Sequence, residues 1–170
     1  MNLFKRLFNK NDATKHHRKT EFSEELRLKV DDYFAYLLTI YNNYVEQYNQ
    51  NKAIRDSINK NLDVEAYLRN MDNGIRLTKK ASEHIKTSPY VYEIPKSVGQ
   101  FMSASRTQFL LSLENYIERD ELIKRILTQQ VDDRLAMDDA NELLAKADQH
   151  LNSAMNYMEK TRDLVYSIES

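Results

Sequence analysis

The chain contains no cysteine and no tryptophan, and only two glycines and two prolines among its 170 residues. Without cysteine there is no disulfide scaffold, no thiol nucleophile and no cysteine metal site, and this suits a reducing compartment such as the cytoplasm. So little glycine and proline disfavours a sheet with many turns, whereas 30% charged residues is typical of helices with solvated faces. The composition therefore predicts an all-α protein.

Charge is nearly balanced over the whole chain but unevenly placed. The net charge of −1 does not indicate a nucleic-acid-binding surface, and no nucleic-acid partner is expected. The first 20 residues carry six basic side chains against Asp12 alone, a net of +5, which leaves −6 on the remainder. We therefore separate a basic segment with its tether, residues 1–20, from one helical domain, residues 21–170.

The first ten residues, MNLFKRLFNK, have the pattern of a short amphipathic helix. The apolar side chains share one face and the basic ones lie towards the other, which is typical of segments that settle on an anionic membrane surface. The candidate docking residues, for a membrane or a partner, are Leu3, Phe4, Lys5, Arg6, Leu7, Phe8 and Lys10. The segment is too short to span a bilayer. Packing of its apolar side chains on the bundle is the alternative.

The rest of the chain is predicted to form four long helices. From Leu26 to Ile58, apolar and aromatic side chains recur at alternating steps of four and three residues, which keeps one stripe facing a neighbouring helix. Helices are predicted over residues 21–59, 64–86, 97–130 and 138–168, with Thr20 or Ser23 as the first cap. Short connections favour an elongated, antiparallel four-helix bundle of coiled-coil-like helices.

Two local features modify this pattern. Asn73-Gly74 is expected to kink or briefly end the second helix, because glycine weakens a helix interior by ~1 kcal/mol relative to alanine. The sequence from Asp139 to Glu142 fits a capping box and predicts that the fourth helix starts near Asp138.

Residues suited to metal or acid–base chemistry are few and poorly spaced. Asp138 and Glu142 share a helical face within an acidic cluster, and a phosphoester hydrolase would use them to hold Mg²⁺. No Glu-x-x-His pair, glycine-rich phosphate loop or Asp-x-Asp motif accompanies them. His84 and His150 have no acidic or histidine residue three or four positions away. The sequence therefore predicts no metal site and no cofactor.

Two stretches in the middle of the chain carry a resemblance to a known family. Met71 to Pro89 reads MDNGIRLTKKASEHIKTSP, a helix that ends near a proline. Gln100 to Glu118 reads QFMSASRTQFLLSLENYIE, an aromatic-led helix that closes in Glu-x-Tyr-x-Glu. This order resembles the central region of the bromochloroindolyl-phosphate hydrolysis family of XpaC-like proteins. The matching positions are Phe101, Leu110, Leu113, Glu114, Tyr116 and Glu118, and Arg106 stands where a proline is common in the family.

The resemblance implies a helical, often membrane-associated bacterial protein. The family is linked by name to phosphate-ester hydrolysis and by association to toxic anion resistance proteins. It implies no active-site residues for this chain.

The sequence supports two functions of different class. The preferred one is a non-enzymatic bacterial helical-bundle interaction protein with a link to toxic anion or envelope stress resistance. It would be cytoplasmic, peripheral at the inner membrane face through residues 1–10, and would bind an unidentified protein partner. The alternative is a hydrolase of indolyl-phosphate-type substrates with Asp138 and Glu142 at its metal site. A third option is a homo-oligomer whose register is set by Gln47 and Asn51, which interrupt the apolar stripe of the first helix.

Overall fold

The computed structural model of the protein describes residues 22–57, 64–87, 94–129 and 133–166. Four helices make up nearly all of these residues: α2 (Glu24–Ser57), α3 (Val64–Thr87), α4 (Lys96–Leu127) and α5 (Asp133–Tyr166). No strand occurs in these four ranges. The predicted all-α class is confirmed, while the basic segment at residues 1–20 lies outside the described part of the chain.

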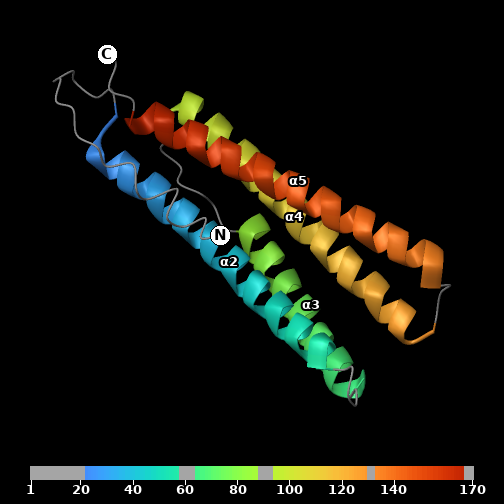
Figure 1. Ribbon diagram of the computed structural model, residues 1–170. Helices are drawn as coiled ribbons and strands as arrows, with labels where there is room; N and C mark the ends of the chain where they lie inside the picture. Colours follow the sequence, from blue (N-terminus) through green and yellow to red (C-terminus); the bar gives the residue numbers. More distant parts are fainter. Residues whose placement is uncertain (1–21, 58–63, 88–93, 130–132, 167–170) are drawn as a thin grey trace.

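The helices form two antiparallel hairpins, α2 with α3 and α4 with α5 (Figure 1). Side-chain contacts fix how the hairpins meet. Near the start of α2, Asp31 accepts a hydrogen bond from the hydroxyl of Tyr166 at the end of α5. Near the start of α3, Asp72 pairs with Lys124 near the end of α4. Each helix is therefore antiparallel to both of its neighbours, which confirms the predicted four-helix bundle.

The ends of the helices follow from local residues, with one correction. The Ser23 hydroxyl accepts a hydrogen bond from the Leu26 N–H at 3.2 Å, so Ser23 acts as the predicted cap of α2. After α4, Gln129 has a φ of 56°, a left-handed conformation that commonly follows a helix end. The predicted start of the fourth helix near Asp138 is wrong, because α5 begins at Asp133. No glycine or proline lies between these two positions, so nothing in the chain prevents the earlier start.

The expected kink at Asn73-Gly74 does not interrupt α3. The helix is continuous from Val64 to Thr87, and its buried residues include Met71, Gly74 and Ile75 on one side. One interior glycine costs only ~1 kcal/mol. Burial of the apolar stripe on both sides of the glycine offsets a cost of that size.

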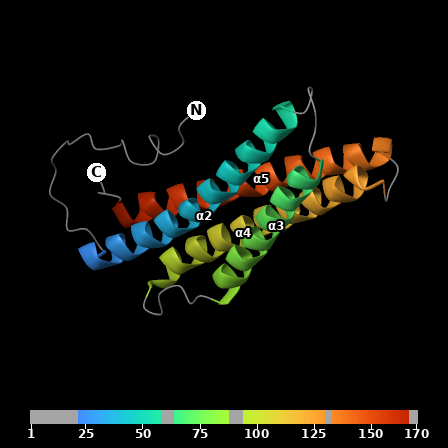
Figure 2. The same ribbon diagram turned by 90° about the horizontal axis from the view of Figure 1, so that it is seen from below.

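The main core lies in the half of the bundle where α2 begins and α5 ends. All four helices contribute to it, and its fully enclosed side chains include Leu37, Ile85, Phe109 and Met158. Beyond this half, the hairpin tips separate, as the two views in Figures 1 and 2 agree. A small cluster at the α4–α5 tip contains side chains of these two helices alone: Leu122, Ile123, Ile126, Ala136, Ala140 and Leu143. We call these regions the four-helix half and the split half.

The α4–α5 hairpin is the most intimately packed pair of helices. The buried alanines of α5, Ala136, Ala140, Ala147 and Ala154, allow the backbones to approach closely. On the facing side of α4, the Ser105 hydroxyl donates a hydrogen bond to the Ala154 carbonyl at 3.1 Å. Close packing thus extends along this hairpin into the split half, where α2 and α3 contribute no side chain to the apolar cluster.

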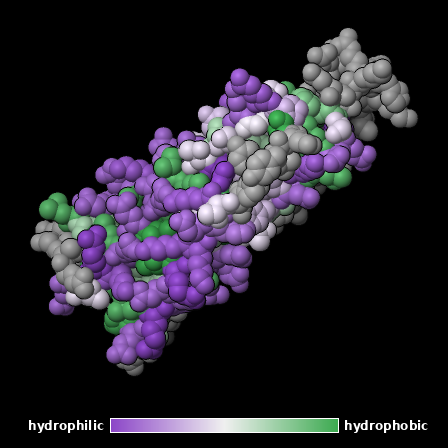
Figure 3. Space-filling view, turned by 180° about the vertical axis from the view of Figure 1, so that it is seen from behind, coloured by the Kyte–Doolittle hydropathy of each residue, from purple (hydrophilic) through white to green (hydrophobic). Residues whose placement is uncertain are grey.

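Val64, the first residue of α3, and Leu127, the last residue of α4, are partly exposed. Val64 and Leu127 retain 38% exposure each, because both lie at hairpin tips. The face seen in Figure 3 is mostly hydrophilic, and its hydrophobic areas are small and separated. The described part of the molecule therefore presents local apolar sites on this face rather than one broad apolar surface.

Candidate functional site

A pocket opens between α2 and α3 where the four-helix half gives way to the split half. Its volume is about 280 Å³, close to the lower end of the range for small-ligand sites. Leu113 of α4 contributes to its lining from behind, and Leu77 of α3 remains 42% exposed and stands at its rim. The lining residues are Ile40, Asn43, Tyr44, Glu46, Gln47, Gly74, Leu77, Thr78, Ala81 and Leu113. We call this site the α2–α3 pocket.

Inside the α2–α3 pocket, the side-chain oxygen of Gln47 lies beside Gly74. The Gln47 side-chain oxygen is shielded from solvent and has no hydrogen-bond partner among the described residues. A Cβ placed on Gly74 would lie 3.9 Å from that oxygen, an ordinary contact distance. Close packing therefore does not require glycine here, and the missing side chain leaves space beside a buried acceptor. A ligand that offers a hydrogen-bond donor would satisfy this oxygen.

One side of the α2–α3 pocket is held by an aromatic pair. Tyr44 of α2 stacks on Tyr116 of α4, with ring centroids 4.2 Å apart and an interplanar angle of 23°. The Tyr116 hydroxyl donates to Asp148 of α5 at 2.7 Å. Burial, and then this hydrogen bond to a carboxylate, hold the pKa of Tyr116 well above its usual value. Three helices are thus tied together beside the pocket, and Tyr116 stays a neutral donor.

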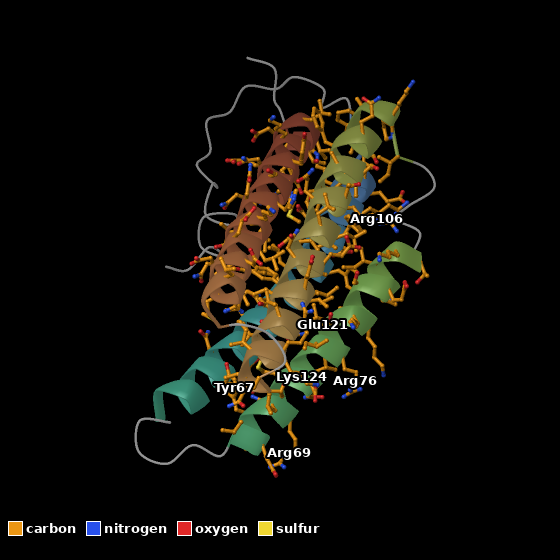
Figure 4. The ribbon with its side chains drawn as sticks, turned by 90° about the vertical axis from the view of Figure 1, so that its right-hand side faces the viewer. Tyr67, Arg69, Arg76, Arg106, Glu121 and Lys124 are labelled. Carbon is orange, nitrogen blue, oxygen red and sulfur yellow. The ribbon has the colours of Figure 1, made fainter. Side chains whose placement is uncertain are left out.

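Ion pairs join α3 to α4 across the seam between the two hairpins. Lys79 pairs with Glu121, and Lys86 pairs with Glu114 at 3.1 Å. With Asp72 and Lys124, these pairs form a series along the seam, and Figure 4 shows Glu121 and Lys124 on α4 beside α3. The side chains are partly exposed, so each pair contributes little stability by itself. The Asp72–Lys124 pair has the opposite polarity to the other two, so a shift of α3 along α4 would bring like charges together and is disfavoured.

Arg106 of α4 closes the end of α3. Its guanidinium donates to the carbonyl oxygens of Ile85 and Lys86, the latter at 2.8 Å. These carbonyls belong to the last turn of α3, where no further helical N–H is present to bond with them. Arg106 therefore caps these two carbonyls through a contact between the hairpins.

The acidic pair proposed for a hydrolase is not assembled into a metal site. Asp138 and Glu142 are both exposed on α5, and the Glu142 carboxylate pairs with Lys146 at 2.7 Å. The hydrogen bond and charge of Lys146 hold the pKa of Glu142 below its usual value. Within the described ranges, no three His, Asp or Glu side chains are grouped closely enough to hold a metal ion. The described residues therefore add no third ligand to Asp138 and Glu142.

Both described histidines bond to neighbouring helices. Nδ1 of His84 on α3 contacts the hydroxyl of Tyr36 on α2. Nδ1 of His150 on α5 lies 2.8 Å from the side-chain oxygen of Gln108 on α4. His84 thus links α3 to α2, and His150 links α5 to α4. Neither histidine lines the α2–α3 pocket.

The candidate docking residues at positions 3–8 and 10 lie outside the described residues, so their prediction stands as made. Among the helices described, none combines the length and apolar character that a membrane-crossing segment needs. Of the two residues proposed to set an oligomer register, Gln47 lines the α2–α3 pocket, and only the helical backbone of Asn51 is described.

Sequence reasoning did not identify the α2–α3 pocket, although two of its signals were visible. Gln47 appeared as a polar interruption of an apolar stripe, and Gly74 appeared as a weak point in a helix. Gln47 was explained as a residue that sets an oligomer register, and Gly74 as the site of a kink in its own helix. Only the packing of α2 against α3 brings the two residues to one site.

No protein-family model, curated protein or solved structure matches this chain. The resemblance of residues 71–118 to the XpaC-like family therefore stays a prediction.

Proposed function

We propose that this protein is a non-enzymatic interaction protein that connects a protein partner to an anionic membrane surface. The helical bundle binds the partner through the α2–α3 pocket. Residues 1–10 hold the bundle at the membrane, which for a bacterial protein is the cytoplasmic face of the inner membrane. A role in toxic anion or envelope stress resistance would follow from the resemblance to XpaC-like proteins.

The observation that carries this proposal is the chemistry of the α2–α3 pocket. Its walls are mainly apolar, its rim includes the exposed Leu77, and its interior contains the unpaired Gln47 oxygen. Amphipathic partner helices bind such grooves by inserting one or a few large apolar side chains between two helices. A partner side chain that combines an apolar body with a hydrogen-bond donor, such as tyrosine or tryptophan, matches this lining.

The membrane part of the proposal is supported by charge as well as by the apolar face of residues 1–10. The net charge of +5 over residues 1–20 favours anionic lipids, while the −6 on the rest of the chain opposes contact of the bundle itself. One short amphipathic segment gives reversible rather than permanent attachment. The bundle would therefore exchange between the membrane surface and solution.

Flotation with vesicles tests the membrane part. The full chain should float with vesicles of equal parts phosphatidylglycerol and phosphatidylcholine, and less so as salt is raised. Substitution of Phe4→Ser together with Phe8→Ser should abolish flotation, whereas Phe22→Ser, beyond the basic segment, should leave it unchanged. Equal flotation of the wild type and the double variant would contradict the proposal.

Photo-crosslinking in the native cell tests the partner part. A photo-crosslinking amino acid in place of Leu77 should give a discrete protein adduct, and the same amino acid at exposed Asn152 on α5 serves as control. Ala81→Trp, which fills the α2–α3 pocket, should remove the adduct at position 77. Turnover of an indolyl phosphate by the purified protein, lost on joint substitution of Asp138→Ala and Glu142→Ala, would replace this proposal by the hydrolase.

A further inference from the structure

We propose that the apolar face of residues 3–8 occupies the α2–α3 pocket of the same molecule when no membrane is present. This inference rests on the proposed function, because it uses the same two surfaces, residues 1–10 and the pocket. It adds a regulatory relation between them. The membrane and the pocket then compete for the apolar side chains of residues 3–8. A partner therefore enters the pocket only after the amphipathic segment has bound to the membrane.

The chain is long enough for this contact. From the start of α2 at Glu24 to Tyr44 beside the pocket, the helix covers about 30 Å at 1.5 Å per residue. The 14 residues from Phe8 to Phe22 span up to about 46–50 Å when extended. The tether can therefore return along α2 to the pocket with length to spare, and the contact needs no second copy of the chain.

The chemistry of the two surfaces is complementary. Leu3, Phe4, Leu7 and Phe8 supply the large apolar side chains that the pocket walls accept. Buried in the pocket, the Gln47 oxygen lacks a partner among the described residues, and a lysine or backbone N–H of the segment would supply its donor. The total charges are also opposite, +5 on residues 1–20 and −6 on the rest.

Charges at the rim predict the orientation of the segment. Glu46 stands on the α2 side of the pocket, whereas Arg76 and Lys80 are exposed beside Leu77 on the α3 side. Lys5 and Arg6 should therefore face α2, because the α3 side would repel them. Glu46→Lys should weaken the contact without altering the apolar lining.

Disulfide trapping in the full chain tests the inference, because the natural chain has no cysteine to interfere. One cysteine replaces Asn9, next to the apolar face, and the second replaces Asn43 at the pocket rim. In the control, Gln149→Cys takes the place of the rim cysteine. Gln149 follows Asp148, the partner of Tyr116, and so lies at the height of the Tyr44–Tyr116 pair, but on α5.

We expect the Asn9–Asn43 pair to form a disulfide within the monomer roughly tenfold faster than the Asn9–Gln149 pair, because docking raises the effective concentration of the two thiols. Ala81→Trp, checked for helical content, should remove this advantage, and so should Phe4→Ser with Phe8→Ser. Vesicles with equal parts of phosphatidylglycerol and phosphatidylcholine should slow the reaction, whereas phosphatidylcholine vesicles alone should not.

Three outcomes would overturn the inference: equal rates for the two pairs, a rate that Ala81→Trp leaves unchanged, or disulfides that form mainly between molecules. Failure of the proposed function is distinguishable from these outcomes. It would show as absent flotation or absent partner adducts, whereas the rates of the two cysteine pairs are compared without membrane or partner.

Discussion

The two halves of the bundle differ in how many helices share each core. In the four-helix half, side chains from all four helices enclose residues such as Leu37 and Phe109 completely. In the split half, the apolar cluster contains side chains of α4 and α5 alone, and its largest members retain 8–9% exposure, as Leu122 and Ile126 show. Stability is therefore concentrated at one end, while the α2–α3 pocket lies where the enclosure begins to open.

This difference affects how each half responds to a loss of side-chain volume. A fully enclosed core tolerates loss of volume poorly, because its neighbours cannot collapse into the space. A two-helix tip relaxes and admits water more easily. One wall of the α2–α3 pocket is therefore backed by a packed aromatic pair, because its lining residue Tyr44 stacks on Tyr116.

Matched leucine-to-alanine substitutions test this difference between the two halves most directly. Leu37→Ala, in the four-helix half, should lower the free energy of unfolding by about 3–5 kcal/mol, because a fully buried side chain leaves a cavity. Leu122→Ala, in the split half, should cost about 2 kcal/mol, at the lower end of the ~2–5 kcal/mol typical of leucine-to-alanine changes in cores. Urea unfolding followed by circular dichroism measures both, and equal costs would remove the distinction between the halves.

Arg106 tests how α3 is attached to the four-helix half. Arg106→Ala should lower the free energy of unfolding by about 1–3 kcal/mol and speed amide hydrogen exchange in the last turn of α3, because two carbonyls lose their donor. Arg106→Lys should be less destabilising than Arg106→Ala, because the lysine ammonium can still donate to one of the carbonyls. Unchanged exchange at residues 83–87 in the alanine variant would show that the cap does not hold α3.

Asp120 makes the stability of the protein depend on pH. Burial raises the pKa of this carboxyl from 3.8 to about 6, against the attraction of Arg119 at 2.7 Å. The carboxylate is thus disfavoured in the fold, so stability should be highest below about pH 4 for this group and should fall as pH rises to about 6.

Asp120→Asn isolates that contribution. At pH 8 the variant should unfold at a higher temperature than the wild type, and its free energy of unfolding should be higher by no more than about 3 kcal/mol. Both differences should vanish near pH 4. Thermal unfolding at several pH values measures this. A variant less stable than the wild type at pH 8 would show that the ion pair with Arg119 outweighs burial.

The smallest expected effect belongs to the ion pairs between the hairpins. A double-mutant cycle on Lys79→Ala and Glu121→Ala should give a coupling of about 0.2–1 kcal/mol that declines with salt, since both side chains are partly exposed. The same cycle on Lys146 and Glu142, within α5 alone, is the matched control. A larger coupling at the first pair would show that charge, rather than apolar packing, holds the split half together.

Residues with a local signal were predicted well. The apolar spacing identified Leu26, Val30 and Leu37 as buried, and Ser23 caps α2 as one of the two expected positions. Asp138 was mistaken for a helix start because a capping box is a short motif that also occurs inside helices, and α5 in fact begins at Asp133. Local motifs mark where a helix can begin, but they do not exclude its continuation when no breaker intervenes.

By itself, the sequence determined four helices, the apolar stripe of each and their up-and-down order. These properties depend on contacts within a few residues and on short connections. Only the tertiary structure decided that one half encloses a core and the other splits, that Arg106 caps a helix of the other hairpin, and that Gln47 meets Gly74 in a pocket. Periodicity shows which face of a helix is buried, but the partner of that face depends on contacts between residues far apart in the chain.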